Sequence, residues 1–169
     1  MMQKLWWRVL QAWSSRPTKQ DWGWAIALLT IYGLVYLPIG LLSGFLRFDP
    51  QLSPGTIAQV MVAAVLMPGL NEELMFRVLP IPHPRESISP GIRWFWIGLS
   101  WISFLLYHLL PWTPSFFREP MFLLGAGLVG TICTIAYLKT GSLWIPVFIH
   151  WQIVVVWLLL LGGLTRFSL

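Results

Sequence analysis

Two adjacent carboxylates and one guanidinium stand inside an otherwise apolar stretch of the sequence, at Glu72, Glu73 and Arg77. Ionisable side chains are costly inside a membrane, so residues of this kind usually serve a function there. On a helix, Glu73 and Arg77 lie one turn apart on one face and can form an ion pair, whereas Glu72 points about 100° away from Glu73. The spacing therefore predicts that Glu72 is left without a partner. A free carboxylate shielded from bulk water is suited to take a proton from a bound water molecule, as a general base does.

Two histidines, His108 and His150, stand in later apolar stretches. Phe104 precedes His108 by one helical turn, so its ring can pack against the imidazole and exclude water. A hydrogen bond from His108 to a neighbouring helix is the alternative, and the sequence leaves it open. By the rise of a helix, His150 and Glu72 each lie roughly 12 Å from the same expected membrane surface, so we expect them to meet. His108 lies roughly 24 Å along its helix, which fits only if that helix begins outside the membrane.

The stretches that carry these residues are expected to span a membrane. The 169 residues are 57% hydrophobic and 10% charged, against roughly 45–50% and about 25% in soluble domains. About 20 apolar residues suffice to cross a bilayer. Runs without Asp, Glu, Lys or Arg cover residues 22–46, 55–71, 94–117, 120–138 and 140–165. The sequence therefore predicts an all-α, polytopic membrane helical bundle with about five transmembrane helices, in which residues 21–169 form one membrane-embedded domain.

Residues 1–20 precede this domain and are predicted to form a basic amphipathic helix on the membrane surface. An irregular basic leader that only sets topology is the alternative. On a helix, one face would carry Met2, Leu5, Trp6, Val9, Leu10 and Trp13, with Lys4, Arg8 and Gln11 off it.

Basic residues outside the spans predict the orientation of the chain. With a cytoplasmic N-terminus, seven of them fall on the cytoplasmic side, Lys4, Arg8, Arg16, Lys19, Arg85, Arg93 and Lys139, and three on the other, Arg47, Arg118 and Arg166. The N-terminus is therefore expected in the cytoplasm. The loop 81–91 would then be cytoplasmic as well, and His83 within it is expected to be solvated.

Several other features point to packing rather than chemistry. The formal charge of +5 is spread over loops and the N-terminus with no basic domain, so no nucleic-acid partner is expected. The run GAGLVG at residues 125–130 matches G-x-G-x-x-G, but no strand precedes it and no acidic residue follows it, so close helix packing is the better interpretation. Cys133 is the only cysteine, which excludes an intrachain disulfide, and it is expected to pack.

The polar motifs resemble those of the CPBP family of intramembrane proteases, which includes the CAAX prenyl endopeptidases, the bacterial Abi proteins and proteins like lysostaphin resistance protein A. The resemblance rests on E-E-x-x-x-R at residues 72–77, F-x-x-x-H at residues 104–108 and G-S-L-W-x-P-x-x-x-H at residues 141–150. The three motifs occur in this order on successive predicted spans, within a protease-like core of about residues 60–160.

This resemblance implies a glutamic-type intramembrane endopeptidase in a bacterial cell membrane. It would cleave a peptide bond of a hydrophobic or membrane-anchored peptide, in contact with membrane lipid and without a cofactor. In the family, the residue at Glu72 activates water with help from the residue at His108, and the residue at His150 helps to hold the oxyanion. The implied supporting side chains are Glu73, Arg77 and Phe104.

The chain departs from the family pattern at Val154, where an asparagine that helps to hold the oxyanion is expected. Losing one oxyanion donor typically costs about 10²–10³ in rate. Trp157 lies one turn further along the face of His150 and offers an indole N–H, so we expect it to supply the missing donor. Gln152 is expected to point away from this face.

Three other functions stay open. A zinc-dependent membrane protease could use the two histidines and two carboxylates, although no H-E-x-x-H motif is present and Glu73 is expected to pair with Arg77. A non-catalytic immunity or adaptor protein on the same scaffold would account for Val154. A transporter that relays protons through the carboxylates is disfavoured by the small number of spans and the lack of an evident repeat.

Overall fold

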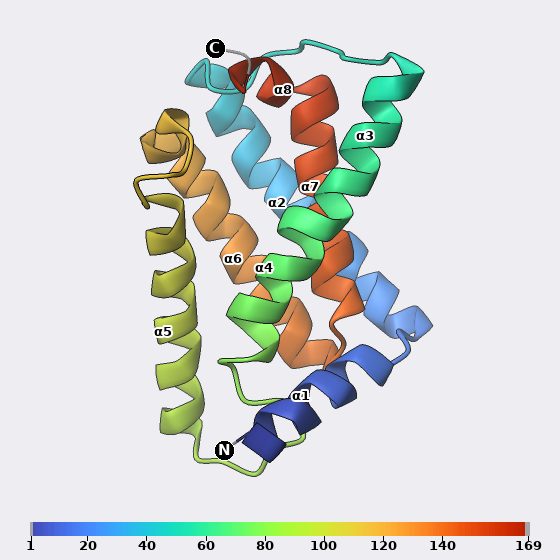
Figure 1. The fold of residues 1–169 in the computed structure, drawn as a ribbon, viewed down its shortest axis with the longest axis vertical. Coiled ribbons are helices and arrows are strands. Elements are labelled where there is room, and N and C mark those ends of the chain that lie inside the picture. The colour runs from blue at the N-terminus through green and yellow to red at the C-terminus, as the bar shows by residue number, and fades with distance from the viewer. Residues whose placement is uncertain (1, 168–169) are drawn as a thin grey trace.

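The computed structural model describes residues 2–167, and most of them are helical (Figure 1). The α-helices are α1 (Met2–Ser14), α2 (Lys19–Leu42), α3 (Pro54–Ala64), α4 (Asn71–Glu73), α5 (Pro90–His108), α6 (Pro120–Thr140), α7 (Trp144–Leu160) and α8 (Gly163–Arg166). Two π-helical turns, Val65–Leu70 and Leu74–Val78, flank α4, and a 3-10 turn, Ser115–Arg118, precedes α6. No β-strand occurs within residues 2–167, so the predicted all-α bundle is confirmed. Residue 1 of the predicted segment 1–20 and residues 168–169 of the predicted domain 21–169 lie outside the described residues.

Three helical segments are long and apolar enough to cross a membrane by length and composition. They are α2, the segment Pro54–Val78 and α6. The apolar helix α7 is shorter, and α5 occupies the remaining stretch for which a span is predicted. All five predicted spans are thus helical, and the chain is a helical membrane protein. The number of crossings, the cytoplasmic N-terminus and the division at residue 20 stay predictions.

Hydroxyl side chains begin three of these helices. Oγ1 of Thr18 accepts a hydrogen bond from the backbone N–H of Asp21, whose carboxylate accepts one from the N–H of Thr18 in return. Ser53 and Ser89 cap α3 and α5 through their Oγ atoms, and each is followed by a proline, which needs no N–H partner at that position. The three caps determine where the helical segments of the first, second and third predicted spans begin.

The second predicted span is broken in its middle, as its proline and glycine predict. Met67 has extended dihedral angles, with φ −145° and ψ 115°, and Pro68 has no N–H with which to continue the helical hydrogen bonds. Gly69 is required at the break because a Cβ there would lie 2.8 Å from the carbonyl oxygen of Ala64. The broken turn packs against α7, and the chain then continues as α4, which carries the two adjacent carboxylates.

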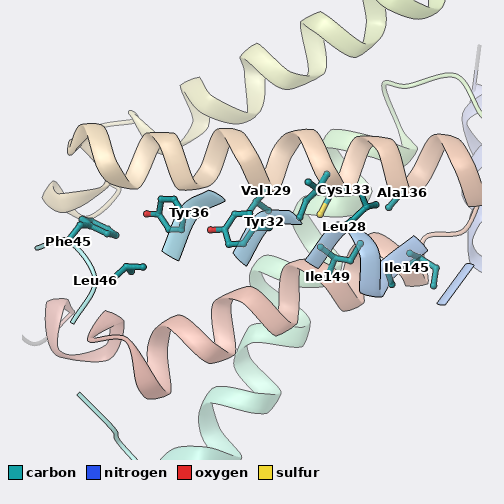
Figure 2. Packing of buried hydrophobic residues seen from close by; sticks show 12 residues of the cluster. Leu28, Tyr32, Tyr36, Phe45, Leu46, Val129, Cys133, Ala136, Ile145 and Ile149 are labelled. Atoms are coloured by element: carbon teal, nitrogen blue, oxygen red, sulfur yellow. The ribbon is translucent and has the colours of Figure 1, made fainter. Parts of the chain in front are cut away.

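The largest buried cluster lies between α2, α6 and α7, and Figure 2 shows side chains from all three helices meeting there. The hydroxyl of Tyr36 donates to the carbonyl oxygen of Met121 at 2.8 Å. Its ring lies so close to Gly125 that a Cβ there would come within 2.6 Å of it. The glycine-rich run 125–130 thus allows close packing, as predicted, and Cys133 is fully buried in the same cluster.

Helix α1 lies across one end of the bundle, beside the loop that follows the second predicted span (Figure 1). The predicted amphipathic helix is therefore confirmed for residues 2–14, and the alternative of an irregular leader is wrong there. The side chains on its exposed face include Met2, Trp6, Leu10 and Trp13, which leaves them free to contact lipid. The opposite face is buried on the bundle and carries Arg8, which is only 9% exposed, and Ala12.

The expectation that His83 is solvated is wrong, because only 2% of this residue is exposed. Helix α1 covers it, and the ring of Trp7 lies 5.5 Å from the imidazole. Nε2 of His83 bonds to the carbonyl oxygen of Gly141 at 3.1 Å, and Nδ1 accepts a hydrogen bond from the backbone N–H of Arg85 at 3.2 Å. The neutral ring therefore joins this loop to the end of α6.

We expect acidification below about pH 6.5 to destabilise the protein through His83. Burial lowers the pKa of His83 from its ordinary value of 6.5, against the opposing effect of the hydrogen bond to Gly141. Stability from this group is complete above the unfolded pKa and is lost as the pH falls toward the lower, folded pKa, because the unfolded chain binds the proton more readily. The ionisable groups around the ring are Arg8 from α1, Arg85 and Glu86 from the loop, Arg93 from α5 and Tyr137 from α6.

Thermal unfolding of the detergent-solubilised protein between about pH 7.5 and pH 5 measures this effect. His83→Gln keeps an N–H donor for Gly141 but does not titrate, so it should lose less stability over that range than the wild type. The difference between the two proteins isolates His83 from other groups that titrate. Equal losses would contradict the prediction.

Candidate active site

The structure brings four of the predicted site residues together from two segments that are distant in sequence. Glu72 and Glu73 belong to α4, Arg77 to the turn that follows it, and His150 to α7. Oε2 of Glu72 lies 3.9 Å from Nε2 of His150. The four side chains are buried, with exposed fractions between 0% and 6%. The expected meeting of Glu72 with His150 is therefore present.

Glu73 is bound by two partners rather than one. Its Oε1 lies 3.2 Å from Nη1 of Arg77, as the spacing predicts, and 2.7 Å from Nδ1 of His150. The second contact was not expected from the sequence. A carboxylate at this distance fixes Nδ1 of His150 as a donor, so Nε2 is the ring nitrogen turned toward Glu72. Glu73 thus orients His150 while Arg77 balances its charge.

Glu72 keeps an unused carboxylate oxygen. Its Oε2 is buried and has no hydrogen-bond partner among residues 2–167. The distance of 3.9 Å to Nε2 of His150 is too long for a direct hydrogen bond. Oε2 of Glu73 is also buried and without a hydrogen-bond partner among the described residues, but of the two carboxylates only Glu72 borders a cavity. The free oxygen of Glu72 is therefore available to a molecule that enters this cavity.

Phe104 and His108 pack as the sequence predicts, with their ring centroids 4.8 Å apart in an edge-on arrangement. The guanidinium of Arg77 lies over the ring of Phe104, 4.4 Å from the ring centroid. Nδ1 of His108 bonds to the carbonyl oxygen of Phe104 at 2.8 Å and must donate to it, which leaves Nε2 as an acceptor in the neutral ring. Among residues 2–167, this ring therefore bonds within its own helix and not to a neighbouring helix, which was the alternative.

The depth of His108 along its helix does not separate it from the carboxylates. Helix α5 begins at Pro90, near the end of the bundle where α1 lies, and ends at His108 (Figure 1). His108, Glu72 and His150 border the same cavity. The three predicted catalytic side chains thus face one space.

The cavity has a volume of about 650 Å³ and is bordered by residues of α2, α3, α5, α6 and α7. Its wall carries the two histidines His108 and His150 and the carboxylate of Glu72, and most of the remaining wall is apolar or aromatic. A space of this size, apolar with a few polar groups at one place, is typical of sites that bind organic ligands or peptide side chains.

Val154, Trp157 and Gln152 all border this cavity. Gln152 therefore does not point fully away from the site, contrary to expectation. Nε1 of Trp157 is buried and has no hydrogen-bond partner in the described part of the chain. The indole ring stacks on Phe45, with the centroids 6.4 Å apart. Trp157 thus has a buried N–H without a partner and lies on the cavity wall, while its role as a donor stays a prediction.

One group of side chains has the spacing of a metal site. Ligand atoms of Glu73, Cys133 and His150 lie within 4.8 Å of one another. These atoms already have other partners, because Glu73 binds both Arg77 and His150 while the thiol of Cys133 donates to the carbonyl oxygen of Pro146. Neither Glu72 nor His108 belongs to the group. The two residues that a zinc protease would add here, Glu72 and His108, thus lie outside this group, and the expectation that no cofactor is needed stays a prediction.

Comparison with known proteins places the chain beside a described protein family. A family model described as type II CAAX prenyl endopeptidase Rce1-like matches residues 53–156. The matched region is more than half of the chain and holds all three motifs, while α1 and α2 precede it. Neither the curated proteins nor the solved structures gave a match.

Proposed function

The chain belongs to the Rce1-like family of type II CAAX prenyl endopeptidases, and we propose that it is a glutamic-type intramembrane endopeptidase in which Glu72 activates the attacking water. The observation that carries this proposal is the free, buried oxygen of Glu72 at 3.9 Å from Nε2 of His150, on the wall of a shared cavity. A water molecule about 2.8 Å from both atoms would form hydrogen bonds to each. Replacement of Glu72 is the direct test and is argued below.

The hydrogen bonds of the two histidines suit them for different tasks. His108 uses Nδ1 as a donor to Phe104, so Nε2 of its neutral ring can accept a proton and pass it on. His150 uses Nδ1 as a donor to Glu73, so in the protonated ring Nε2–H is directed to the cavity and can donate to an oxyanion. We therefore assign His108 to proton transfer and His150 to oxyanion binding.

The reaction then proceeds in two steps. The water oxygen bonds to the peptide carbonyl carbon while its proton passes to Glu72, and the oxyanion that forms is held by Nε2–H of His150. The C–N bond then breaks as the leaving amine takes the proton from Glu72, directly or through His108. The products are a carboxylic acid and an amine, and Glu72 is again ionised.

The substrate is proposed to be a hydrophobic or membrane-anchored peptide segment of the CAAX type or a related one. The predominantly apolar wall of the cavity favours such a segment over a soluble, charged peptide. The membrane is proposed to be a bacterial cell membrane, with the N-terminus in the cytoplasm as the distribution of basic residues predicts.

Trp157 is proposed to supply the second oxyanion donor in place of Val154. Trp157→Phe keeps an aromatic ring but removes the N–H, so kcat should fall by about 10²-fold. Gln152→Ala is the matched control, since it removes another polar group on the cavity wall. Adding Val154→Asn to the Trp157→Phe protein should restore part of the rate. Equal effects of Trp157→Phe and Gln152→Ala would remove Trp157 from the mechanism.

A further inference from the structure

Helix α1 is bonded to the end of the segment that carries Glu72. The guanidinium of Arg8 donates to the carbonyl oxygens of Leu79 and Pro80, at 2.9 and 3.4 Å, where that segment ends. It also binds both carboxylate oxygens of Glu86 in the following loop, at 2.6 and 3.0 Å. Arg8 is 9% exposed, so these bonds are shielded from water and are stronger than those of a surface ion pair.

The other end of α1 is bonded to the start of the helix that carries His150. The backbone N–H of Leu143 donates to the carbonyl oxygen of Ala12 at 3.0 Å. Two side-chain bonds lie beside it, from Ser142 Oγ to the Ser15 carbonyl at 3.1 Å and from Trp144 Nε1 to the Trp13 carbonyl at 2.8 Å. Helix α1 therefore links the segment of the general base to the helix of the oxyanion donor.

We propose that Arg8 is a positioning residue, which acts through α1 to hold the segment of Glu72 in register with α7. The inference rests on the proposed function and extends it to a helix that precedes the region matched by the family model. Its physical basis is that catalysis requires Glu72 and His150 to stay within a narrow range of distances, and a displacement of about 1 Å can cost 10²-fold in rate. Among residues 2–167, the polar contacts between α4 and α7 are those of His150 with the two carboxylates.

The test compares Arg8→Gln, Arg8→Lys and Arg16→Gln. The assay is cleavage of a farnesylated fluorogenic peptide with a C-terminal CAAX sequence, in lipid nanodiscs. Arg8→Gln should lower kcat by roughly 10- to 100-fold with KM changed less than about threefold, because α1 does not border the cavity. Arg8→Lys should recover part of the loss, since it keeps the charge beside Glu86 but not the planar fork that reaches both sets of acceptors. Arg16 is exposed and makes no hydrogen bond or ion pair with residues 2–167, so Arg16→Gln should behave as wild type.

Hydrogen exchange supplies a readout that does not depend on activity. The amide of Leu143 and those of the first turn of α7 should exchange faster in Arg8→Gln than in Arg16→Gln. A kcat equal to that of wild type, or an effect on KM alone, would overturn the positioning role. If Arg8→Gln does not fold, Arg8→Lys and Glu86→Gln carry the same comparison with smaller expected losses.

The same measurements separate this proposal from the proposed function. If the wild type and Glu72→Gln both fail to cleave the peptide, the proposed function fails. The amide hydrogen-exchange rate of Leu143 then tests on its own whether Arg8 couples α1 to α7. An unchanged rate in Arg8→Gln would show that it does not.

Discussion

Replacing Glu72 with glutamine should lower kcat on a membrane peptide substrate by about 10²–10⁴-fold, the contribution of a positioned general base. Glutamine has nearly the shape of glutamate but cannot take a proton from water. The free oxygen of Glu72 has no hydrogen-bond partner within the described range, so the change breaks no bond at that atom. It also removes a buried negative charge. The fold and its thermal stability should therefore be retained.

Turnover of the farnesylated CAAX-type peptide in nanodiscs, measured over a range of concentrations, separates kcat from KM for this variant. Glu119→Gln is the matched control, because Glu119 pairs with Arg166 and does not border the cavity. Full activity of Glu72→Gln would refute water activation by this residue. If both proteins instead keep a cellular phenotype and partner binding without cleaving any peptide, the adaptor function favoured by Val154 is the better account.

The contacts within one helix were predictable from the sequence, because helical spacing alone determines them. Glu73 and Arg77, and Phe104 and His108, are each one turn apart and do meet. The predicted break at Pro68 is also present, since proline lacks the N–H that a helix needs. These local rules hold equally in water and in a membrane.

The contacts between helices could be predicted only in part. Equal depth along two helices predicts that Glu72 and His150 meet, but it does not indicate that Glu73 holds the other ring nitrogen of His150 at 2.7 Å. That contact depends on the direction that α4, which carries Glu73, takes after the break at Pro68. The burial of His83 and Arg8 has a similar cause, because both are covered only where α1 docks on a loop far from it in the sequence. A loop histidine between two prolines carries no sign of such a cover.

Glu73→Gln should destabilise the protein by roughly 3–5 kcal/mol, the cost of leaving one partner of a buried ion pair unpaired. The side chain of Arg77 is 1% exposed, and its closest carboxylate oxygen in the structure is Oε1 of Glu73 at 3.2 Å. Glutamine can still accept the hydrogen bond from His150, so the loss comes mainly from the unpaired guanidinium. Turnover should fall as well, because a neutral amide accepts the hydrogen bond from Nδ1 of His150 less strongly than a carboxylate does.

Adding Arg77→Met to Glu73→Gln separates the cost of the charge from the cost of packing. The double variant removes both charges, and methionine can keep a contact with the ring of Phe104, over which Arg77 lies. Most of the lost stability should therefore return, to within about 1–2 kcal/mol of wild type, while turnover should stay low because the carboxylate that orients His150 is still absent. Chemical denaturation in detergent measures the stability of both variants. A double variant as unstable as Glu73→Gln would mean that the bond to His150, rather than the unpaired charge on Arg77, accounts for the stability that Glu73 provides.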